Sequence, residues 1–409
     1  MYNLLSGLRV IEAASFVAGP SCGLHLAQMG AEVIRIDTIG GGPDYTRWPV
    51  DDKNQPLYWE GLNKGKRSIA VNLRDPRGRD LMLDIITAQT GHSGLLITNF
   101  PVEGFLSYDV LAQRRKDLIC MRIMGWPDGR PAMDYTVNAA SGLPFLTGPA
   151  ECETPVNHLL PAWDLLTGAY GAFALLAAEK NRQVTGRGEE IRLPLSDIVA
   201  SSLSYTGMVA ETLVRDLKRE RTGNDVYGAF GRDFTTRDGK QIMVVAITAK
   251  QWRELLASLG LETNISSLEK ELGLSFAKEA GLRFEHRERL FPIFQQAISY
   301  IDFTDLAERF DRRGVTWSPF RTMYDAVRQD ERMFAGNPIF ESIDHISGHR
   351  YPAAGTAATL PTAQRGHVRG APRLGQDTDA VLADVLGLSE QAIGHLHDQG
   401  LVASQEDQV

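Results

Sequence analysis

The segment Asn157–Gly168, NHLLPAWDLLTG, places a single carboxylate, that of Asp164, directly before a long apolar run. That run, residues 165–180, is typical of a buried helix. The first turn of a helix has free backbone N–H groups and the positive end of the helix dipole, and both stabilise negative charge. Asp164 would therefore stay ionised and could act as a nucleophile. Aspartate is also a favoured N-cap residue, so a purely structural cap is the alternative.

The chain begins with a β-α-β pattern that is typical of a doubly wound α/β sheet. Residues 8–14, LRVIEAA, and 31–37, AEVIRID, are short apolar runs that predict parallel strands. Between them, Pro20 suits the first turn of a helix and Gly30 suits its C-terminal cap. The first turn lacks the GxGxxG pattern, which argues against a nicotinamide cofactor even though Asp37 ends the second strand.

Two later strands are followed or preceded by candidate ligand-binding residues. The strand 94–100 ends in Asn99 and Phe100, where an adenine could be hydrogen-bonded and stacked, because ligands bind beyond the carboxyl ends of parallel strands. The strand 68–73 follows a basic cluster that could contact phosphate. This basic cluster consists of Lys64, Lys66 and Arg67, and Arg74 lies just beyond the strand.

The sequence predicts two domains. We expect residues 1–215 and 335–409 to form a large Rossmann-like domain, and residues 225–325 to form a smaller α+β domain. Residues 216–224 and 326–334 are the expected linkers. In the smaller domain, a turn at Asp238-Gly239 predicts a hairpin, and three helical segments are expected between Lys250 and Phe310. Two short capped helices are expected near the C-terminus.

Composition limits the kind of protein this can be. The 409 residues are 43% hydrophobic and 23% charged, as in ordinary globular proteins, and the net charge of −8 argues against a nucleic acid or an anionic membrane as the main partner. The three cysteines, Cys22, Cys120 and Cys152, form no CxxC pair, which favours a reducing compartment. Without a signal peptide or an apolar run of roughly 20 residues, we expect a cytoplasmic protein.

An ordered set of motifs resembles the class III CoA-transferase family, the group of formyl-CoA transferase and carnitine CoA-transferase. The motifs extend over nearly the whole chain. They are LRVIEAASFVAGPSCGLHLAQMGAEVIRID, NKGKRSIAVNLRDPRG, LITNFP, WDLLTG, VTGRGEEIRLPLSD, DGKQIMV and APRLGQDTD. Further segments resemble a branch of that family that moves CoA between the two carboxyl groups of mesaconate in the 3-hydroxypropionate bicycle, a route of carbon fixation and glyoxylate assimilation. These are GGGPDYTRWPV, DYTVNAASGLPFLTGP, VNHLLPAWDLLTG and VYGAFGRDF.

The resemblance implies a Rossmann-like large domain with a parallel sheet built from both chain ends, a smaller α+β domain, and an interlocked homodimer. It implies that Asp164 is the nucleophile. No metal and no permanently bound cofactor is expected, since coenzyme A enters as part of the substrate. The resemblance also assigns CoA contacts to Val17, Ala18, Val71, Asn72, Leu73, Arg74, Asn99, Phe100 and Pro101.

The chain departs from the family in three places. Thr38 stands where formyl-CoA transferase has an arginine, and VYGAFGRDF occupies the region of its glycine-rich loop, so formate-type and oxalate-type substrates are not expected. Related racemases carry a catalytic histidine-aspartate pair where this chain has Met133-Asp134. A methionine cannot transfer a proton, which argues against a racemase.

The sequence therefore predicts an intramolecular CoA transferase. An intermolecular CoA transferase and a non-catalytic CoA-binding or nucleotide-binding protein are the alternatives. Arg47, His158 and Arg122 are candidates, by position, to bind the free carboxylate of the substrate. Tyr135 and the backbone near Gly142 are candidates for an oxyanion hole.

Overall fold

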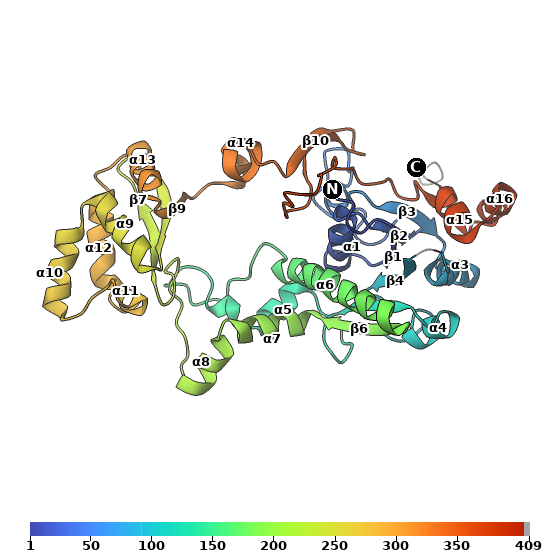
Figure 1. Cartoon of the computed structure of the whole chain (residues 1–409), viewed down its shortest axis with the longest axis horizontal. Helices are drawn as coiled ribbons and strands as arrows, with labels where there is room; N and C mark the ends of the chain where they lie inside the picture. The colour runs from blue at the N-terminus through green and yellow to red at the C-terminus, as the bar shows by residue number, and fades with distance from the viewer. Residues whose placement is uncertain (91, 405–409) are drawn as a thin grey trace. The chain divides into compact units, whose positions relative to one another are not determined.

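The structure is a computed structural model that describes residues 1–90 and 92–404. The chain divides into two compact units (Figure 1). The large unit comprises Met1–Ser141, His158–Asp216 and Asn337–Val409, and the small unit comprises Gly142–Asn157 and Leu217–Gly336. Residues 142–157, which were expected in the large domain, therefore cluster with the small unit.

The large unit contains a seven-stranded sheet in the order β12-β3-β2-β1-β4-β5-β6. All pairings are parallel except that of β12, which runs antiparallel to β3 at the sheet edge. Both the fold class and the contribution of the two chain ends to one sheet are as predicted. The strands are β1 (Leu8–Ala13), β2 (Glu32–Thr38), β3 (Arg67–Val71), β4 (His92–Thr98), β5 (Ile119–Met124), β6 (Glu189–Pro194) and β12 (Val402–Ala403).

Helices cover both faces of this sheet, because its strands are apolar on both sides (Figure 1). One face packs against α1 (Ala18–Gln28), α6 (Ala162–Thr185) and α7 (Leu195–Tyr205). The other packs against α3 (Pro76–Thr87), α4 (Tyr108–Arg114), α15 (Thr378–Leu386) and α16 (Glu390–Asp398). The remaining elements of the unit are α2 (Leu57–Leu62), α5 (Asp134–Ala140), α8 (Met208–Arg215), β10 (Phe340–Asp344) and β11 (Arg350–Ala354).

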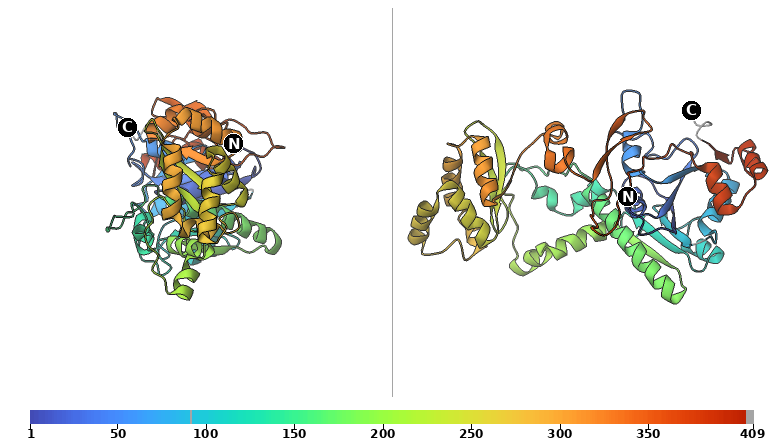
Figure 2. Two further views of the ribbon diagram at one scale, coloured as in Figure 1. Left: turned by 90° about the vertical axis from the view of Figure 1, so that its left-hand side faces the viewer. Right: turned by 45° about the horizontal axis from the view of Figure 1, so that its top comes forward.

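The small unit has a three-stranded antiparallel sheet and a core of its own (Figure 2). The predicted hairpin at Asp238-Gly239 is present between the first two strands. Five helices, rather than three, occupy the next stretch, because Gly260 and Gly273 end two of them in the left-handed region. The elements are η1 (Leu143–Phe145), β7 (Phe230–Thr235), β8 (Gln241–Ala246), α9 (Ala249–Leu259), α10 (Glu262–Leu272), α11 (Ala280–Glu285), α12 (Arg287–Ile298), α13 (Phe303–Arg313), β9 (Thr316–Pro319), α14 (Met323–Gln329) and η2 (Glu331–Ala335).

Local signals account for several helix ends. Asp75 caps α3 by accepting a hydrogen bond of 2.9 Å from the N–H of Arg77, with Pro76 in the first turn. The two helices expected near the C-terminus are α15 and α16. Residues 326–334, an expected linker, are largely helical, since they include the end of α14 and most of η2. In the described part of the chain, every helix is too short or too polar to cross a membrane.

Helix α6 approaches α1 closely at Gly168. A Cβ atom added there would lie 2.0 Å from the Ser21 Oγ and 2.9 Å from the Ala18 carbonyl oxygen. The absence of a side chain thus lets the first turns of α6 lie directly on the helix that follows β1. This contact matters for function because Asp164 lies in the same first turns of α6.

We expect Gly168→Ala to lower the free energy of unfolding by roughly 1–3 kcal/mol through overpacking, despite the higher helix propensity of alanine. Urea denaturation followed by circular dichroism would measure it. Gly394 in α16 is the matched control, because nothing lies within 4 Å of an added Cβ there. Gly394→Ala should be neutral or slightly stabilising, and equal effects at the two sites would contradict the close-contact explanation.

Candidate active site

Asp164 lies in a cavity of about 980 Å³ in the large unit. The cavity is located at the carboxyl ends of the parallel strands, where open α/β sheets bind ligands. Its wall includes the turn after β1, the end of β4 and the first turn of α6. All residues that line this cavity belong to the large unit.

Asp164 is not the N-cap of α6, so the purely structural alternative is wrong. The cap position is Pro161, which offers no side-chain hydrogen bond. The capping carboxylate comes instead from Asp134 at the start of α5. Its Oδ2 atom accepts hydrogen bonds from the backbone N–H of Trp163 (2.7 Å) and of Asp164 (3.1 Å). The side chain of Asp164 is thereby available for another role.

The carboxylate of Asp164 has no hydrogen-bond or ion-pair partner among residues 1–90 and 92–404. Burial, and to a smaller extent the charge of Asp134, raise the pKa of Asp164 to about 7 against the opposing charge of Arg47. This differs from the expectation that the helix end would keep Asp164 ionised, because Asp134 already occupies two of the N–H donors. A partly buried carboxylate with a raised pKa and no partner is typical of a functional site.

Five of the nine predicted CoA contacts line the cavity: Val17, Ala18, Asn99, Phe100 and Pro101. The amide group of Asn99 donates to the Ser15 carbonyl (3.2 Å) and accepts from the Ser15 N–H (3.3 Å), which fixes the turn after β1. Residues 71–74 are not part of the cavity wall. Val71 is fully buried in the core, and Asn72, Leu73 and Arg74 lie just beyond it.

The candidates for the substrate carboxylate have different surroundings. Arg47 and Tyr135 line the cavity, and the Tyr135 hydroxyl donates to the Leu159 carbonyl at 3.2 Å. His158 instead contacts Asp134 through its Nε2 atom. Arg122 is fully buried and binds Glu190 and backbone carbonyls that include that of Phe100, so the prediction for Arg122 is wrong. Arg122 holds the end of β4 in place.

Tyr58 is a cavity residue that the sequence did not single out. Its hydroxyl is buried without a hydrogen-bond partner in the described part of the chain, and the Arg47 guanidinium carbon lies 5.6 Å from its ring centre. Burial raises the pKa of Tyr58 to about 12, with Asp44 and Asp164 acting in the same direction against Arg47. In the sequence, Tyr58 stands beside Trp59, and nothing in this aromatic pair distinguishes a cavity residue from a core residue. Trp59 is indeed buried in the core.

A buried network of charged side chains supports the floor of the site. Arg35 donates to Asp37 (2.9 Å) and Asp44 (2.9 Å), and Lys66 donates to Glu12 (2.8 Å). Asp37 is thus engaged by Arg35 rather than by a ribose. Lys66, which was expected to contact phosphate, is buried because it neutralises Glu12.

The network also shapes the turn after β1. Asp44 accepts a hydrogen bond of 3.1 Å from the N–H of Phe16, whose φ of 70° lies in the left-handed region. A non-glycine residue held in this conformation is strained, and such residues concentrate at functional sites. Phe16 and Asp164 line the same cavity, so the strained residue is part of the candidate site.

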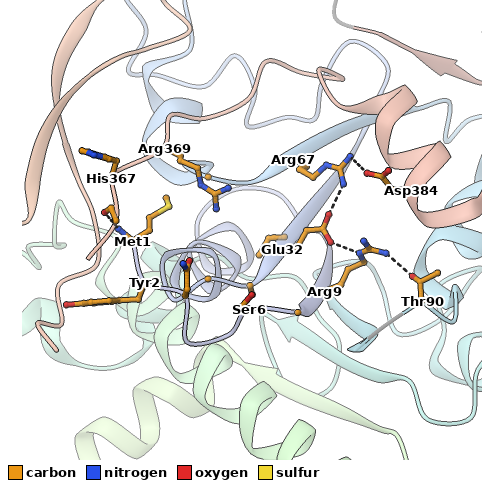
Figure 3. A pocket seen from close by; sticks show the side chains of 17 residues that line it. Met1, Tyr2, Ser6, Arg9, Glu32, Arg67, Thr90, His367, Arg369 and Asp384 are labelled. Atoms are coloured by element: carbon orange, nitrogen blue, oxygen red, sulfur yellow. Dashed lines mark hydrogen bonds and ion pairs between the residues drawn. The ribbon is translucent and has the colours of Figure 1, made fainter. Parts of the chain in front are cut away.

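A second cavity of about 670 Å³ lies at the amino ends of β1, β2 and β3 (Figure 3). Arg9 and Arg67 converge there on the two oxygens of Glu32, at 2.6 Å and 2.7 Å, and so are largely neutralised (Figure 3). It contains no unpartnered carboxylate comparable to Asp164. Within residues 1–90 and 92–404, no three or more histidine, cysteine, aspartate or glutamate side chains are grouped to hold a metal ion.

Comparison with known proteins matches this arrangement to a family. The sequence pattern of CoA-transferase family III matches residues 5–378. The chain belongs to CoA-transferase family III. Among members of this family, the 2-methylfumaryl-CoA isomerase of Chloroflexus aurantiacus is 45% identical to the chain, over 99% of both sequences.

Two further proteins resemble this chain over nearly its whole length at lower identity. The human succinyl-CoA:glutarate CoA-transferase is 27% identical over 98% of this chain and 90% of its own. A CAIB/BAIF family protein from Brucella suis, with 24% identity, superimposes with a TM-score of 0.75 over 94% of this chain and 100% of its own. The structural likeness shows that the fold is shared.

Proposed function

We propose that this enzyme is an intramolecular CoA transferase that converts 2-methylfumaryl-CoA (mesaconyl-C1-CoA) into 3-methylfumaryl-CoA (mesaconyl-C4-CoA). The observation that carries the proposal is the unpartnered carboxylate of Asp164 in a cavity at the strand ends. The 45% identity to an isomerase of this name supports the choice of substrate. The cytoplasm, proposed from the cysteine pattern, is where acyl-CoA substrates would be met.

In the proposed mechanism, the Asp164 carboxylate attacks the C1 thioester and forms a mixed anhydride while CoA leaves as a thiolate. The thiolate attacks the aspartyl carbonyl, which gives an aspartyl-CoA thioester and mesaconate. The C4 carboxylate of mesaconate attacks this thioester, forms the second anhydride and expels CoA again as a thiolate. The thiolate then takes the C4 acyl group, and Asp164 is regenerated as a carboxylate.

Arg47 is the proposed partner of the free substrate carboxylate. Three arginines line the cavity, and two already have acidic partners: Arg130 binds Asp128 and Arg192 binds Glu190, both at 2.7 Å. Arg47 has no carboxylate within ion-pair distance among the described residues. Its charge would hold one carboxylate of mesaconate while the other reacts.

Exchange with external acid tests the intramolecular reaction. The enzyme is incubated with mesaconyl-C1-CoA and isotope-labelled free mesaconate, and the products are separated by chromatography. We expect mesaconyl-C4-CoA without label, because bound mesaconate stays in the cavity between steps. Label in either thioester would support the second candidate, an intermolecular transferase, which the name of the human relative makes the natural alternative.

Chemical trapping tests the covalent intermediates. Hydroxylamine attacks acyl anhydrides and thioesters, so its addition during turnover should convert Asp164 into an aspartyl hydroxamate. Peptide mass spectrometry would locate the modification. An unmodified Asp164 alongside inactivation would contradict the aspartyl-CoA intermediate, whereas binding of mesaconyl-C1-CoA without any turnover would favour the non-catalytic CoA-binding alternative.

We also propose that the enzyme is a homodimer. The large unit exposes apolar side chains that a monomer would leave in water: Leu166, Tyr170 and Phe173 on α6 are 43%, 44% and 65% exposed. Helix α8 has no buried residue at all. Such surfaces mark interfaces. Light scattering coupled to size-exclusion chromatography should give twice the mass of the chain, and a monomer would refute the proposal.

A further inference from the structure

Asp134 is the most deeply engaged carboxylate of the site. It is 1% exposed, its Oδ2 atom accepts the N–H groups of Trp163 and Asp164, and its Oδ1 atom contacts the His158 imidazole. The three groups come from the first turn of α6 and from the loop that leads into it. Asp134 therefore ties the start of α5 to the start of α6.

This arrangement directs the stabilising field of the helix end to one carboxylate rather than to the other. The N–H donors of an N-terminal turn stabilise a negative charge where they bind it. Here they bind Asp134. The side chain of Asp164 lies in the first turn of the same helix, with a like charge beside it and no donor of its own among the described residues.

We propose that Asp134 is a positioning residue that withholds the α6 N–H donors from Asp164 and keeps a negative charge beside it. The carboxylate of Asp164 is therefore repelled by Asp134, and this repulsion ends when Asp164 is acylated. This inference rests on the proposed role of Asp164. Both aspartyl intermediates are neutral at Asp164, so repulsion from Asp134 exists in the free enzyme and disappears in them. Such repulsion favours acylation over the resting state.

Three charged or titratable groups on three segments interact with Asp164, and a fourth group, His158, contacts one of them. Asp134 on α5 disfavours the charged form of Asp164, and Arg47, on the loop between β2 and α2, favours it. Tyr58 on α2 is neutral at physiological pH, because its pKa is about 12. His158 contacts Asp134 directly. Removal of the Asp134 charge should therefore lower the pKa of Asp164.

The test replaces Asp134 with a neutral residue that can still cap the helix. In Asp134→Asn, the amide oxygen can accept the N–H groups of Trp163 and Asp164, while the charge is gone. The acidic limb of the pH profile of kcat/KM reports the ionisation of the free enzyme. We expect this limb to move to lower pH by about one unit, and kcat above pH 8 to fall roughly 3- to 10-fold.

Asp330 provides a matched control in the small unit. Its carboxylate likewise accepts two backbone N–H groups, those of Arg332 (3.0 Å) and Met333 (2.9 Å). Asp330→Asn should leave the acidic limb where it is. If Asp134→Asn does not fold, Asp134→Ser supplies a second neutral cap for the same measurement.

The outcomes separate this inference from the proposed function. An unshifted acidic limb in Asp134→Asn, with hydroxylamine still trapping Asp164, would overturn the role of Asp134 and leave the transferase mechanism standing. A shifted limb with a comparable melting temperature would support it, because a merely structural role would change stability without changing ionisation. Failure to trap Asp164 in the wild type would count against the proposed function itself.

Discussion

Asp164→Ala should lower kcat for the conversion of mesaconyl-C1-CoA by at least about 10⁴-fold, because every covalent step of the proposed mechanism passes through this carboxylate. Substrate binding should change little, since the proposed CoA contacts lie on other segments. Product formation is measured by chromatography, and binding by titration calorimetry with the substrate. Retention of more than a small fraction of turnover would exclude Asp164 as the nucleophile.

The same residue should cost the protein stability in a pH-dependent way. The pKa of Asp164 is raised to about 7 in the folded protein from 3.8 as the ordinary value. Its favourable contribution is thus complete below pH 3.8 and is lost as the pH rises through 7. At pH 8, the free energy of unfolding of Asp164→Asn should exceed that of the wild type by roughly 1–2 kcal/mol, after allowance for solvent in the cavity, and its melting temperature should be higher. The difference should shrink at pH 4.

That combination distinguishes a catalytic carboxylate from a structural one. A structural cap would stabilise the helix, so its loss would lower the melting temperature. Loss of a nucleophile that is desolvated and lies beside a like charge should instead raise the melting temperature, because its buried negative charge destabilises the folded state. An inactive and more stable Asp164→Asn would be the expected signature, whereas an inactive and destabilised one would contradict it.

The strands and helices around the site were predictable because their signals are local. Val10, Ile34 and Ile69 are fully buried in parallel strands whose apolar runs are visible in the sequence. Asp75-Pro76 marks the start of α3 within two residues. The position of Asp164 in the first turn of α6 follows from the apolar run behind it, whereas its proposed role as the nucleophile came from the resemblance to the class III CoA-transferase family.

The electrostatics of the site could not be predicted, since they depend on partners distant in the chain. Asp134 lies 29 residues from Trp163, whose N–H it accepts. Lys66 lies 54 residues from Glu12, and only the fold makes it a buried counter-ion instead of a phosphate ligand. The sequence made Arg122 and Arg47 equal candidates to bind the substrate carboxylate. In the structure, Arg122 donates hydrogen bonds to backbone carbonyls, whereas Arg47 has no carboxylate partner among the described residues.

Arg47 carries the second large prediction. In the proposed reaction, mesaconate must remain bound after CoA has left it, and Arg47 is the cavity arginine available for its free carboxylate. Arg47→Gln removes the charge and keeps a planar donor group. We expect kcat/KM for mesaconyl-C1-CoA to fall by about 10²-fold, as when one member of a charge-assisted pair is removed. Labelled free mesaconate should then enter the product thioesters.

A substrate without the second carboxylate shows whether the effect arises from that contact. Crotonyl-CoA can acylate Asp164 but offers nothing for Arg47 to bind. At a pH well above the pKa of Asp164, where both proteins have an ionised nucleophile, capture of its acyl group by hydroxylamine should therefore be nearly equal in wild type and Arg47→Gln. The ratio of the two losses isolates the interaction between guanidinium and carboxylate. Equal losses with both acyl-CoA substrates would mean that Arg47 acts on Asp164 or on the fold. A loss confined to the dicarboxylic substrate, together with entry of external mesaconate, would make retention by Arg47 the step that keeps the transfer within one molecule.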